Sequence, residues 1–251
     1  MTDSPRPFFS VVIPVYNRES LIKETLRSVF NQTYTDYEVI VVDDGSTDET
    51  VEVLQSYGDT VRLIEQKNQG PGVARNRGIE AARGTYVAFL DSDDRWFPFS
   101  LQCYADAIAA HDRPAFVAGS PFVFHDPSEL EEVDNSDVSS TYFADYLASG
   151  DAWRWFSVSS FVVKKRALQE VGGFSSDWIN AEDADLALRL GTAKGFVDIH
   201  GAPTFAYRRH SATAMDNISR TIEGALHNIA AEKEGKYPGG EARRVERWRI
   251  L

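Results

Sequence analysis

The first ninety residues alternate short apolar runs with segments of helical spacing. Four runs have the continuous, β-branched character of buried strands and cover residues 9–15, 37–42, 61–64 and 86–90. Between these runs, apolar residues recur three and four positions apart, as they do on one face of a helix. This order predicts parallel strands joined by right-handed helical crossovers, with helices on both faces of the sheet.

The second half of the chain is less regular. We expect strands at 116–123, 196–199 and 204–207, because apolar and β-branched residues are concentrated there. A helix is expected at 182–190, and a closing amphipathic helix near 222–229.

The stretch 125–140 is acidic and has no core-forming pattern, so we expect a loop there that is long enough to act as a lid over a ligand. The amino-acid composition changes gradually along the chain, with no abrupt change that would mark a domain boundary, and there is no internal repeat or low-complexity segment. The sequence therefore predicts one domain over residues 1–251, with parts at about 1–95, 96–215 and 216–251.

Polar residues follow each of the four predicted strands in the first half. They are Tyr16, Asn17 and Arg18 after the first, Asp43, Asp44, Gly45 and Ser46 after the second, Asn68, Gln69 and Gly70 after the third, and Asp91, Ser92, Asp93 and Asp94 after the fourth. In sheets of this kind the ligand binds beyond the carboxyl ends of the strands. We therefore expect the chemistry of the protein at this edge.

The acidic residues at this edge favour a bound cation. Asp91, Asp93 and Asp94 repel one another unless a cation neutralises them, and their hard oxygen atoms suit Mg²⁺ or Mn²⁺, which would also bind substrate phosphates. The alternative is a solvated turn in which one aspartate caps a helix. Asp43 has a similar alternative, an Asx-turn before the next helix, whereas Asp44 is placed to accept hydrogen bonds from a base or ribose.

The overall charge limits the classes of binding partner, and the cysteine count indicates the redox compartment. A formal charge of −12 argues against nucleic acid, because nucleic-acid binding needs a basic surface. An acidic protein with a phosphorylated substrate needs a local source of positive charge, such as a bound cation. The single cysteine, Cys103, excludes an internal disulfide and fits a reducing compartment.

The chain shows no membrane-spanning pattern. No apolar run approaches the roughly 20 residues that cross a bilayer, and residues 1–9 lack the layout of a secretory signal. We therefore expect a cytoplasmic protein with no transmembrane segment. The C-terminal basic segment could make weak peripheral contact with an anionic membrane, or form a solvated helix face, through Arg243, Arg244, Arg247, Trp248 and Arg249.

Six strings occur along the chain in the order SVVIPVYNRE, YEVIVVDDGSTDET, NQGPGVARNRGI, GTYVAFLDSDD, VGGF and AEDADLALRL. Each is moderately specific, and together in this order they resemble the family 2 glycosyltransferases of GT-A fold. The resemblance covers roughly residues 9–210. It implies a three-layer α/β/α sandwich with a mostly parallel, Rossmann-like central sheet. It also implies an inverting, metal-dependent transfer of a sugar from a nucleoside diphosphate, most often UDP, to an acceptor hydroxyl.

The resemblance implies where the nucleotide binds. The pocket would be lined by the residues at the end of the first strand, Pro14, Val15, Tyr16 and Asn17. Asp44 would hold the base, which is often uracil in this family. Arg75 would lie near the nucleotide, and its alternative is an arginine on a helix surface.

The resemblance also implies a metal site of Mg²⁺ or Mn²⁺. Asp91 and Asp93 would be the D-x-D pair, with Asp93 the more direct metal ligand and Asp91 nearer the ribose or diphosphate, and Ser92 lies between them in the same binding segment. His210 would match a late histidine that completes the metal shell in the family. The alternative for His210 is a surface or packing histidine.

The general base is predicted in a later string. An inverting displacement needs a carboxylate that takes the proton of the acceptor hydroxyl as the oxygen attacks, and positive charge beside the leaving diphosphate. Glu182 and Asp183 resemble the family's acidic pair, in which the second member is the base. We therefore predict Asp183 as the general base beside Glu182. The alternative is that both residues complement the helix dipole.

The acceptor is not identified by the sequence. The resemblance assigns the nucleotide sugar to the first part of the chain and the acceptor to the second, and family acceptors include saccharides, lipid-linked sugars and proteins. Four aromatic residues near the presumed acceptor side would stack on sugar rings or pack in the core, namely Trp153, Trp155, Phe156 and Trp178. The donor sugar and the oligomeric state are not encoded in any feature of the sequence.

Three other classes of protein share parts of this pattern. A receiver domain needs its acidic pair after the first strand, whereas here the pair follows the second. A sugar nucleotidyltransferase needs a glycine-rich loop after the first strand, where this chain has PVYNRE. A non-catalytic nucleotide-sugar binder of the same fold would have no need to retain Asp91, Asp93 and Asp183.

Overall fold

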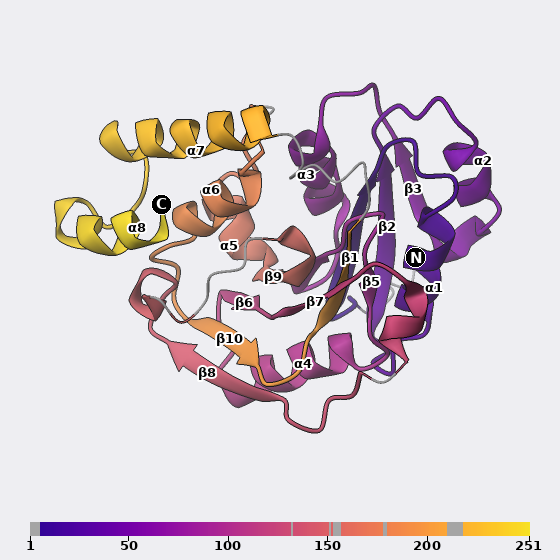
Figure 1. Cartoon of the computed structure of the whole chain (residues 1–251), viewed down its shortest axis with the longest axis horizontal. Helices are drawn as coiled ribbons and strands as arrows, with labels where there is room; N and C mark the ends of the chain where they lie inside the picture. The colour runs from indigo at the N-terminus through magenta and orange to yellow at the C-terminus, as the bar shows by residue number, and fades with distance from the viewer. Residues whose placement is uncertain (1–5, 132, 151, 153–156, 178–179, 210–217) are drawn as a thin grey trace.

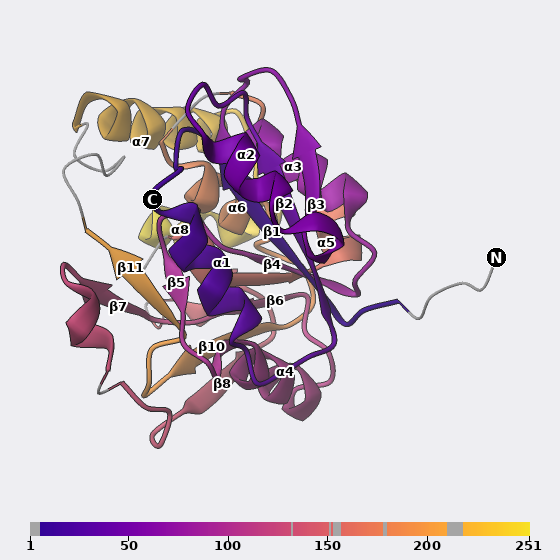
Figure 2. The ribbon, with the colours of Figure 1, turned by 90° about the vertical axis from the view of Figure 1, so that its right-hand side faces the viewer.

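The computed structural model describes residues 6–131, 133–150, 152, 157–177, 180–209 and 218–251. A large sheet runs through the molecule, with helices on both of its faces (Figure 1). Its strands stand in the order β3-β2-β1-β4-β9-β6-β10-β8. A second sheet has the order β5-β11-β7, and its strands lie together at one side of the molecule (Figure 2).

The strands of the large sheet are β1 (Phe9–Val15), β2 (Tyr37–Asp43), β3 (Arg62–Glu65), β4 (Tyr86–Phe89), β6 (Phe116–Ala118), β8 (Ser139–Phe143), β9 (Phe161–Lys164) and β10 (Phe196–His200). Those of the small sheet are β5 (Arg95–Trp96), β7 (Pro121–Phe124) and β11 (Phe205–Arg208). The helices are α1 (Ile22–Phe30), α2 (Thr50–Gln55), α3 (Pro71–Ala81), α4 (Ser100–Ala110), α5 (Lys165–Glu170), α6 (Glu182–Arg189), α7 (Ile218–Lys233) and α8 (Arg244–Ile250).

The register of the first strands brings their carboxyl ends to one edge. β1 pairs in parallel with β2 up to Val15 and Asp43, and in parallel with β4 up to Val12 and Phe89. β9 is antiparallel to both β4 and β6, so the second half of the sheet is mixed. The polar residues that follow β1, β2 and β4 therefore share one edge, as the strand order predicts.

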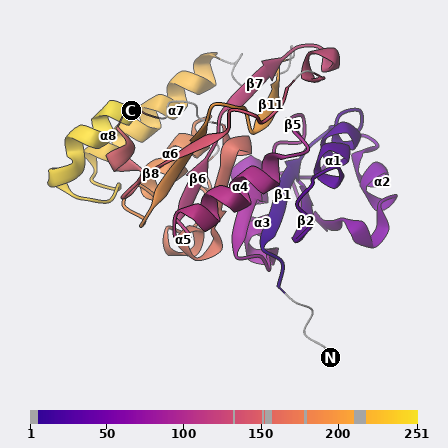
Figure 3. The same ribbon diagram turned by 90° about the horizontal axis from the view of Figure 1, so that it is seen from below.

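Two apolar layers cover the large sheet, one on each face. The side chains of β1 alternate, with Val11 and Ile13 on one face and Val12 on the other. The first face packs against α1, α2 and α4, and the second against α3, α5 and α6, an arrangement that Figure 3 shows from below. The predicted three-layer α/β architecture with a large, mostly parallel sheet is confirmed.

Two expected elements differ from the structure. The expected strand at 116–123 is divided into β6 and β7, because the chain leaves the large sheet at Gly119 and enters the small one. A Cβ atom at Gly119 would lie 2.1 Å from Oγ1 of Thr204, so only glycine fits this crossing. The expected loop at 125–140 contains a short 3₁₀ turn at Pro127–Leu130, and β8 begins at its end.

The last two helices form the end of the molecule opposite α1 and α2 (Figures 1 and 3). They pack on the outer side of α6 through a small apolar cluster of Leu147, Leu188, Ala231 and Tyr237. This cluster joins the C-terminal segment to the second half of the large sheet.

The arginines near the C-terminus are largely engaged within the protein. Arg247 is buried and donates from Nε and Nη2 to the two carboxylate oxygens of Glu232, at 2.6 and 3.0 Å. Arg243 pairs with Asp145 at 2.8 Å. Buried Arg247 therefore cannot reach the membrane surface considered for this segment. None of the helices in the described ranges has the length and apolar character to cross a membrane.

Candidate active site

A cleft of about 490 Å³ opens where the strands β1, β2 and β4 end. It is lined by most of the residues that the sequence singles out: Pro14, Val15, Tyr16, Asp44, Arg75, Asp91, Ser92, Asp93, Glu182 and Asp183. Glu182 and Asp183 reach the cleft from α6, about ninety residues further along the chain than Asp93. The geometry therefore brings the residues predicted for the donor and those predicted for the base into one cavity.

Of the predicted site residues within the described ranges, Asn17 does not line the cleft. Asn17 has a left-handed backbone (φ 50°), and its side-chain oxygen accepts a hydrogen bond from the backbone N–H of Thr47 at 2.8 Å. The side chain of Asn17 thus ties the loop after β1 to the loop after β2, and its contact with a nucleotide stays a prediction. His210 lies outside the described residues, as do Trp153, Trp155, Phe156 and Trp178.

The two aspartates after β2 have different partners. The Asp43 carboxylate accepts hydrogen bonds from the backbone N–H groups of Gly45 and Ser46, at 3.1 and 3.0 Å, which is an Asx-turn. Asp44 is buried and accepts from the N–H groups of Gln69 and Gly70, at 2.9 and 2.8 Å. Asp44 therefore fixes the wall of the cleft formed by the loop before α3, and its carboxylate also faces the cleft.

Arg75 connects the two acidic strings of the site. Its side chain is only 5% exposed. One terminal nitrogen donates to Asp91 at 2.6 Å, and the other donates to Glu182 at 2.9 Å. The guanidinium also lies 5.3 Å from the centre of the Phe174 ring. Burial alone would lower the pKa of Arg75, but the charges of Asp91 and Glu182 together have the larger effect. The net result is a pKa above the ordinary value for arginine, so the side chain stays a cation.

The aspartates after β4 have three different environments. Asp94 is fully buried and accepts hydrogen bonds from the Ser159 hydroxyl at 2.6 Å and from the N–H of Arg208 at 3.0 Å. Burial, and repulsion from Asp93 and Asp91, raise the pKa of Asp94 well above its ordinary value. Asp94 thus anchors β11 to the end of β4. The side chains of Asp91 and Asp93 remain partly exposed in the cleft, at 30% and 23%.

The residues present fit a divalent cation held partly by a substrate. Burial raises the pKa of Asp91, and repulsion from Asp93 adds to this, so a cation between these groups would relieve an existing charge conflict. Within the described ranges, no three histidine, cysteine or acidic side chains are arranged as a metal cage. Mg²⁺ and Mn²⁺ commonly take one or two carboxylates and complete their shell with phosphates and water. Asp91 and Asp93 match that pattern.

The Asp183 carboxyl group has a pKa close to neutral pH. It lies in the first turn of α6, and its carboxylate accepts a hydrogen bond from the N–H of Ala184 at 2.7 Å. Burial and the adjacent charge of Glu182 raise the pKa of Asp183 to about 7. A carboxylate with this pKa is a stronger base than an ordinary aspartate and is still ionised in part at neutral pH.

The cleft contains residues to which the sequence assigns no individual role. Arg18 pairs with Asp93 at 3.4 Å, and its Nε is a buried atom without a hydrogen-bond partner among the described residues. Its place directly after β1 is a signal that could have identified it. Arg208 and Thr221 also line the cleft, but they lie in β11 and α7, whose position depends on the tertiary fold, so spacing alone could not place them.

Comparison with known proteins places these features in a family. Residues 10–172 match the family model described as "Glycosyl transferase family 2". The chain is 48% identical over 92 residues to the uncharacterized glycosyltransferase YibD of Escherichia coli, which covers 36% of this chain and 27% of YibD. It is 36% identical over 141 residues to the putative teichuronic acid biosynthesis glycosyltransferase TuaG of Bacillus subtilis, which covers 55% of this chain and 56% of TuaG. The matches thus span about half the length of these relatives or less.

Solved structures share the fold. The structure of S. aureus TarS 1-349 in complex with UDP-GlcNAc superposes with a TM-score of 0.74 and 21% identity, over 94% of this chain and 69% of that one. The mannosyltransferase PcManGT from Pyrobaculum calidifontis, in complex with GDP-Man and Mn²⁺, has a TM-score of 0.65 and 24% identity, over 94% and 67% of the two chains. At sequence identities below 25%, the similarity to these structures supports a shared fold only.

Proposed function

We propose that this chain, which belongs to glycosyl transferase family 2, moves a sugar from a nucleoside diphosphate to an acceptor hydroxyl with inversion at the anomeric carbon. The proposed donor is a UDP-linked sugar. The observation that carries the proposal is the pairing of buried Arg75 with both Asp91 and Glu182. This pairing holds the donor side and the base side of the reaction on one cleft.

The donor would bind at the ends of the first two strands. Pro14, Val15 and Tyr16 line that part of the cleft, and Asp44 faces it from the loop after β2. The solved structures of TarS and PcManGT are complexes with UDP-GlcNAc and with GDP-Man, so both of these proteins of similar fold bind nucleoside diphosphate sugars. The Asp44 carboxylate would accept a hydrogen bond from a donor group of the base, such as the N–H of a uracil ring.

The diphosphate would bind where the cleft is lined by the residues after β4, beside positively charged groups. Asp91 and Asp93 would hold a Mg²⁺ or Mn²⁺ ion, whose chemistry is to stabilise the charge of the leaving diphosphate. Arg18 and Arg208 also line the cleft. The Arg18 guanidinium, which pairs with Asp93 at 3.4 Å, would donate to a phosphate oxygen there. His210 is proposed to complete the metal shell on the basis of the sequence alone.

Asp183 would act as the general base. Its carboxylate takes the proton of the acceptor hydroxyl as that oxygen bonds to the anomeric carbon and the bond to the diphosphate breaks. Glu182, held by Arg75 at 2.9 Å, keeps negative charge beside Asp183 and thereby supports its raised pKa. The acceptor is proposed only as a hydroxyl-bearing molecule that reaches Asp183 through the open side of the cleft.

Donor binding is tested first. We expect UDP with Mn²⁺ to raise the melting temperature of the protein, with a shift that grows with ligand as RT ln(1 + [L]/Kd), and UDP alone to raise it less. NAD and ATP serve as the comparison nucleotides. Stabilisation by those nucleotides, with none by UDP or GDP in the presence of Mn²⁺, would contradict the proposed donor class.

The role of Asp183 is tested in the same protein. Asp183→Asn should slow transfer or hydrolysis of the bound donor about 100-fold or more, because general-base catalysis typically contributes this much, while the affinity for UDP with Mn²⁺ stays near that of the unsubstituted protein. Asp177→Asn is the matched control, since Asp177 is an exposed carboxylate close in sequence that does not line the cleft. A rate for Asp183→Asn within a few-fold of the Asp177→Asn rate would remove Asp183 from the reaction.

A further inference from the structure

The C-terminal part of the chain contacts the segment that carries the proposed base. The family match ends at residue 172, whereas Glu182 and Asp183 lie beyond it. Helix α7 packs against α6, and Thr221 of α7 lines the cleft together with Asn180 and Ala181. Helix α7 therefore contributes a residue to the wall of the cleft next to the start of α6.

The contact between α7 and this wall is close because α7 has a glycine at the crossing. A Cβ atom on Gly224 would lie 2.5 Å from the carbonyl oxygen of Asn180 and 3.0 Å from the Cβ of Ala181. Both neighbours belong to or adjoin the backbone, which cannot rotate away as a flexible side chain could. The position of helix α7 thus limits where the backbone of Asn180 and Ala181 can lie just before α6.

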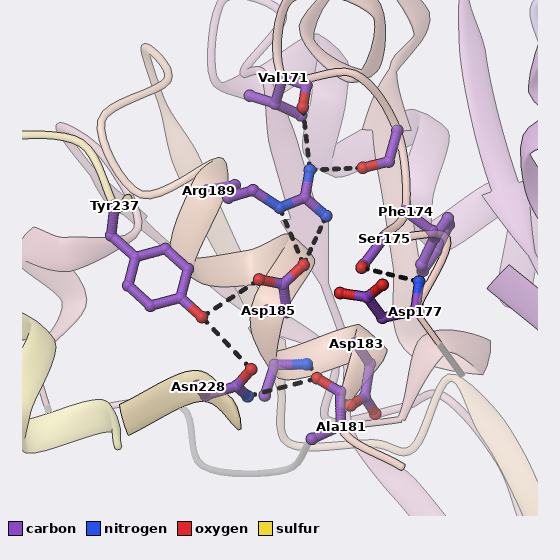
Figure 4. A network of polar contacts seen from close by, with 12 residues as sticks. Val171, Phe174, Ser175, Asp177, Ala181, Asp183, Asp185, Arg189, Asn228 and Tyr237 are labelled. Atoms are coloured by element: carbon purple, nitrogen blue, oxygen red, sulfur yellow. Dashed lines mark hydrogen bonds and ion pairs between the residues drawn. The ribbon is translucent and has the colours of Figure 1, made fainter. Parts of the chain in front are cut away.

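One turn further along α7, a buried polar network holds the same segment (Figure 4). Asn228 donates from its side-chain nitrogen to the carbonyl of Ala181 at 3.4 Å. The Tyr237 hydroxyl lies 3.3 Å from the side-chain oxygen of Asn228 and 3.1 Å from Oδ1 of Asp185. Asn228, Tyr237 and Asp185 are all buried. The residues before and after Asp183 are therefore both attached to the C-terminal segment.

The network continues to the loop before the site. The second oxygen of Asp185 accepts two hydrogen bonds from Arg189, at 2.8 and 2.7 Å, and Arg189 also donates to the carbonyls of Val171 and Gly173. The next residue is Phe174, whose ring packs under the Arg75 guanidinium. A continuous set of contacts thus runs from Tyr237 to both sides of the acidic pair.

We propose that Asn228 and Tyr237 are positioning residues, which fix the start of α6 so that Asp183 meets the acceptor hydroxyl in reactive geometry. The proposal rests on the proposed function in that it takes Asp183 as the base. Neither Asn228 nor Tyr237 lines the cleft, so they have no direct contact with the donor. Displacing the start of α6 should slow the base-dependent step and leave donor binding intact.

Two substitutions change this attachment in different ways. Tyr237→Phe removes the hydroxyl and keeps the ring, and Gly224→Ala inserts a methyl group against the Asn180 carbonyl. Tyr86→Phe is the matched control, because the buried Tyr86 hydroxyl donates to the Pro114 carbonyl at 2.9 Å, at the opposite end of β4 from the cleft. Each variant is compared with the unsubstituted chain at equal folded concentration.

Three measurements separate positioning from general destabilisation. Hydrogen exchange reports the backbone of α6 and of β1, calorimetry gives the Kd of UDP with Mn²⁺, and UDP release from UDP-GlcNAc gives the rate of hydrolysis. For Tyr237→Phe and Gly224→Ala we expect faster exchange in α6 but not in β1, a Kd within about twofold, and hydrolysis slower by about tenfold. Tyr86→Phe should leave the exchange of α6 and the hydrolysis rate unchanged.

The results have distinct meanings. Unchanged exchange in α6, or slower hydrolysis fully explained by weaker UDP binding, would overturn the proposal. Exchange that rises equally in α6 and β1 would also overturn it, because it would show only a less stable protein. If the unsubstituted chain neither binds UDP with Mn²⁺ nor hydrolyses UDP-GlcNAc, the proposed donor fails, and the exchange of α6 then decides by itself whether the C-terminal segment positions this helix.

Discussion

Glu182 and Asp183 are adjacent in the chain, yet their carboxyl groups have different surroundings. Glu182 is paired with the Arg75 guanidinium at 2.9 Å, whereas Asp183 accepts a hydrogen bond from the N–H of Ala184. Burial and the neighbouring charge raise the pKa of Asp183 to about 7. One carboxylate is engaged in an ion pair, and the other can exchange a proton near neutral pH.

This pKa gives a pH dependence with a definite sign. The proposed base works only when ionised, and a pKa of about 7 leaves Asp183 mostly protonated at acidic pH. We expect the rate of transfer or donor hydrolysis to rise with pH and to level off above about 7, with close to a tenfold loss for each unit well below that value. The measurement is kcat/KM between pH 5 and 9 at constant ionic strength.

The Kd of UDP with Mn²⁺ is measured over the same range, because the pKa of Asp91 is raised as well. Correcting kcat/KM at each pH for the change in this Kd leaves the contribution of the base to the rate. A corrected profile that is flat between pH 5 and 8 would show that no group with this pKa takes part.

Single residues at strand ends could be predicted, but their partners could not. Asp44 and Asp91 come directly after apolar runs, so parallel strand order alone places them at one edge. The pairing of Arg75 with Glu182 joins positions 107 residues apart. Such a contact depends on how the second half of the sheet brings α6 over α3, and no local spacing contains that information.

At the scale of elements, helix α3 lies unusually close to strand β1. A Cβ atom on Gly78 would lie 2.3 Å from Cγ1 of Val12 in β1. In an exposed helix, replacing glycine with alanine gains up to about 1 kcal/mol. Here the added methyl group has no room, so packing outweighs helix propensity.

We expect Gly78→Ala to lower the free energy of unfolding by about 2 kcal/mol, because overpacking a filled core costs more than the helix gains. Chemical denaturation of Gly78→Ala, Val12→Ala and the double variant measures this. Since Val12→Ala removes the methyl groups that would clash, the double variant should be clearly more stable than the sum of the single losses predicts. Additive losses would show that α3 moves away freely.

The elements themselves follow the apolar pattern, and their boundaries depart from it for local reasons. Helix α2, for example, begins only at Thr50, because the polar residues before it form a turn. In that turn, Thr47 donates to Asn17 and Asp48 accepts from the N–H of Thr50 at 3.1 Å. Helical periodicity does not reveal side-chain bonds of this kind to another loop.

At the scale of the whole molecule, the cleft depends on residues far beyond the family match. Asn180, Asp183, Tyr207 and Thr221 all line it, whereas the match ends at residue 172. The C-terminal helices are in turn held by the Arg247–Glu232 pair, whose side chains are 4% and 2% exposed. The division of the chain into three parts of one domain stays a prediction.

Breaking this buried pair should loosen the C-terminal segment. Arg247→Ala leaves Glu232 as a buried, unpaired charge, which costs about 3 kcal/mol in the free energy of unfolding. Arg249→Ala, on the exposed side of the same helix, should change it by less than about 0.5 kcal/mol. Thermal and denaturant unfolding of both variants measure the difference, and equal losses would mean that the pair contributes nothing beyond its surroundings.

The distance along the chain between Arg75 and Glu182 has a consequence for synthesis. A ribosome releases the residues of β1 to β4 well before those of α6. During that interval the Arg75 guanidinium and the Asp91 carboxylate exist on the nascent chain without the third member of their ion triad. The second ion pair of Arg75, with Glu182, can form only when α6 has emerged, so the last contact made at this edge attaches α6 to the strand ends that are already in place.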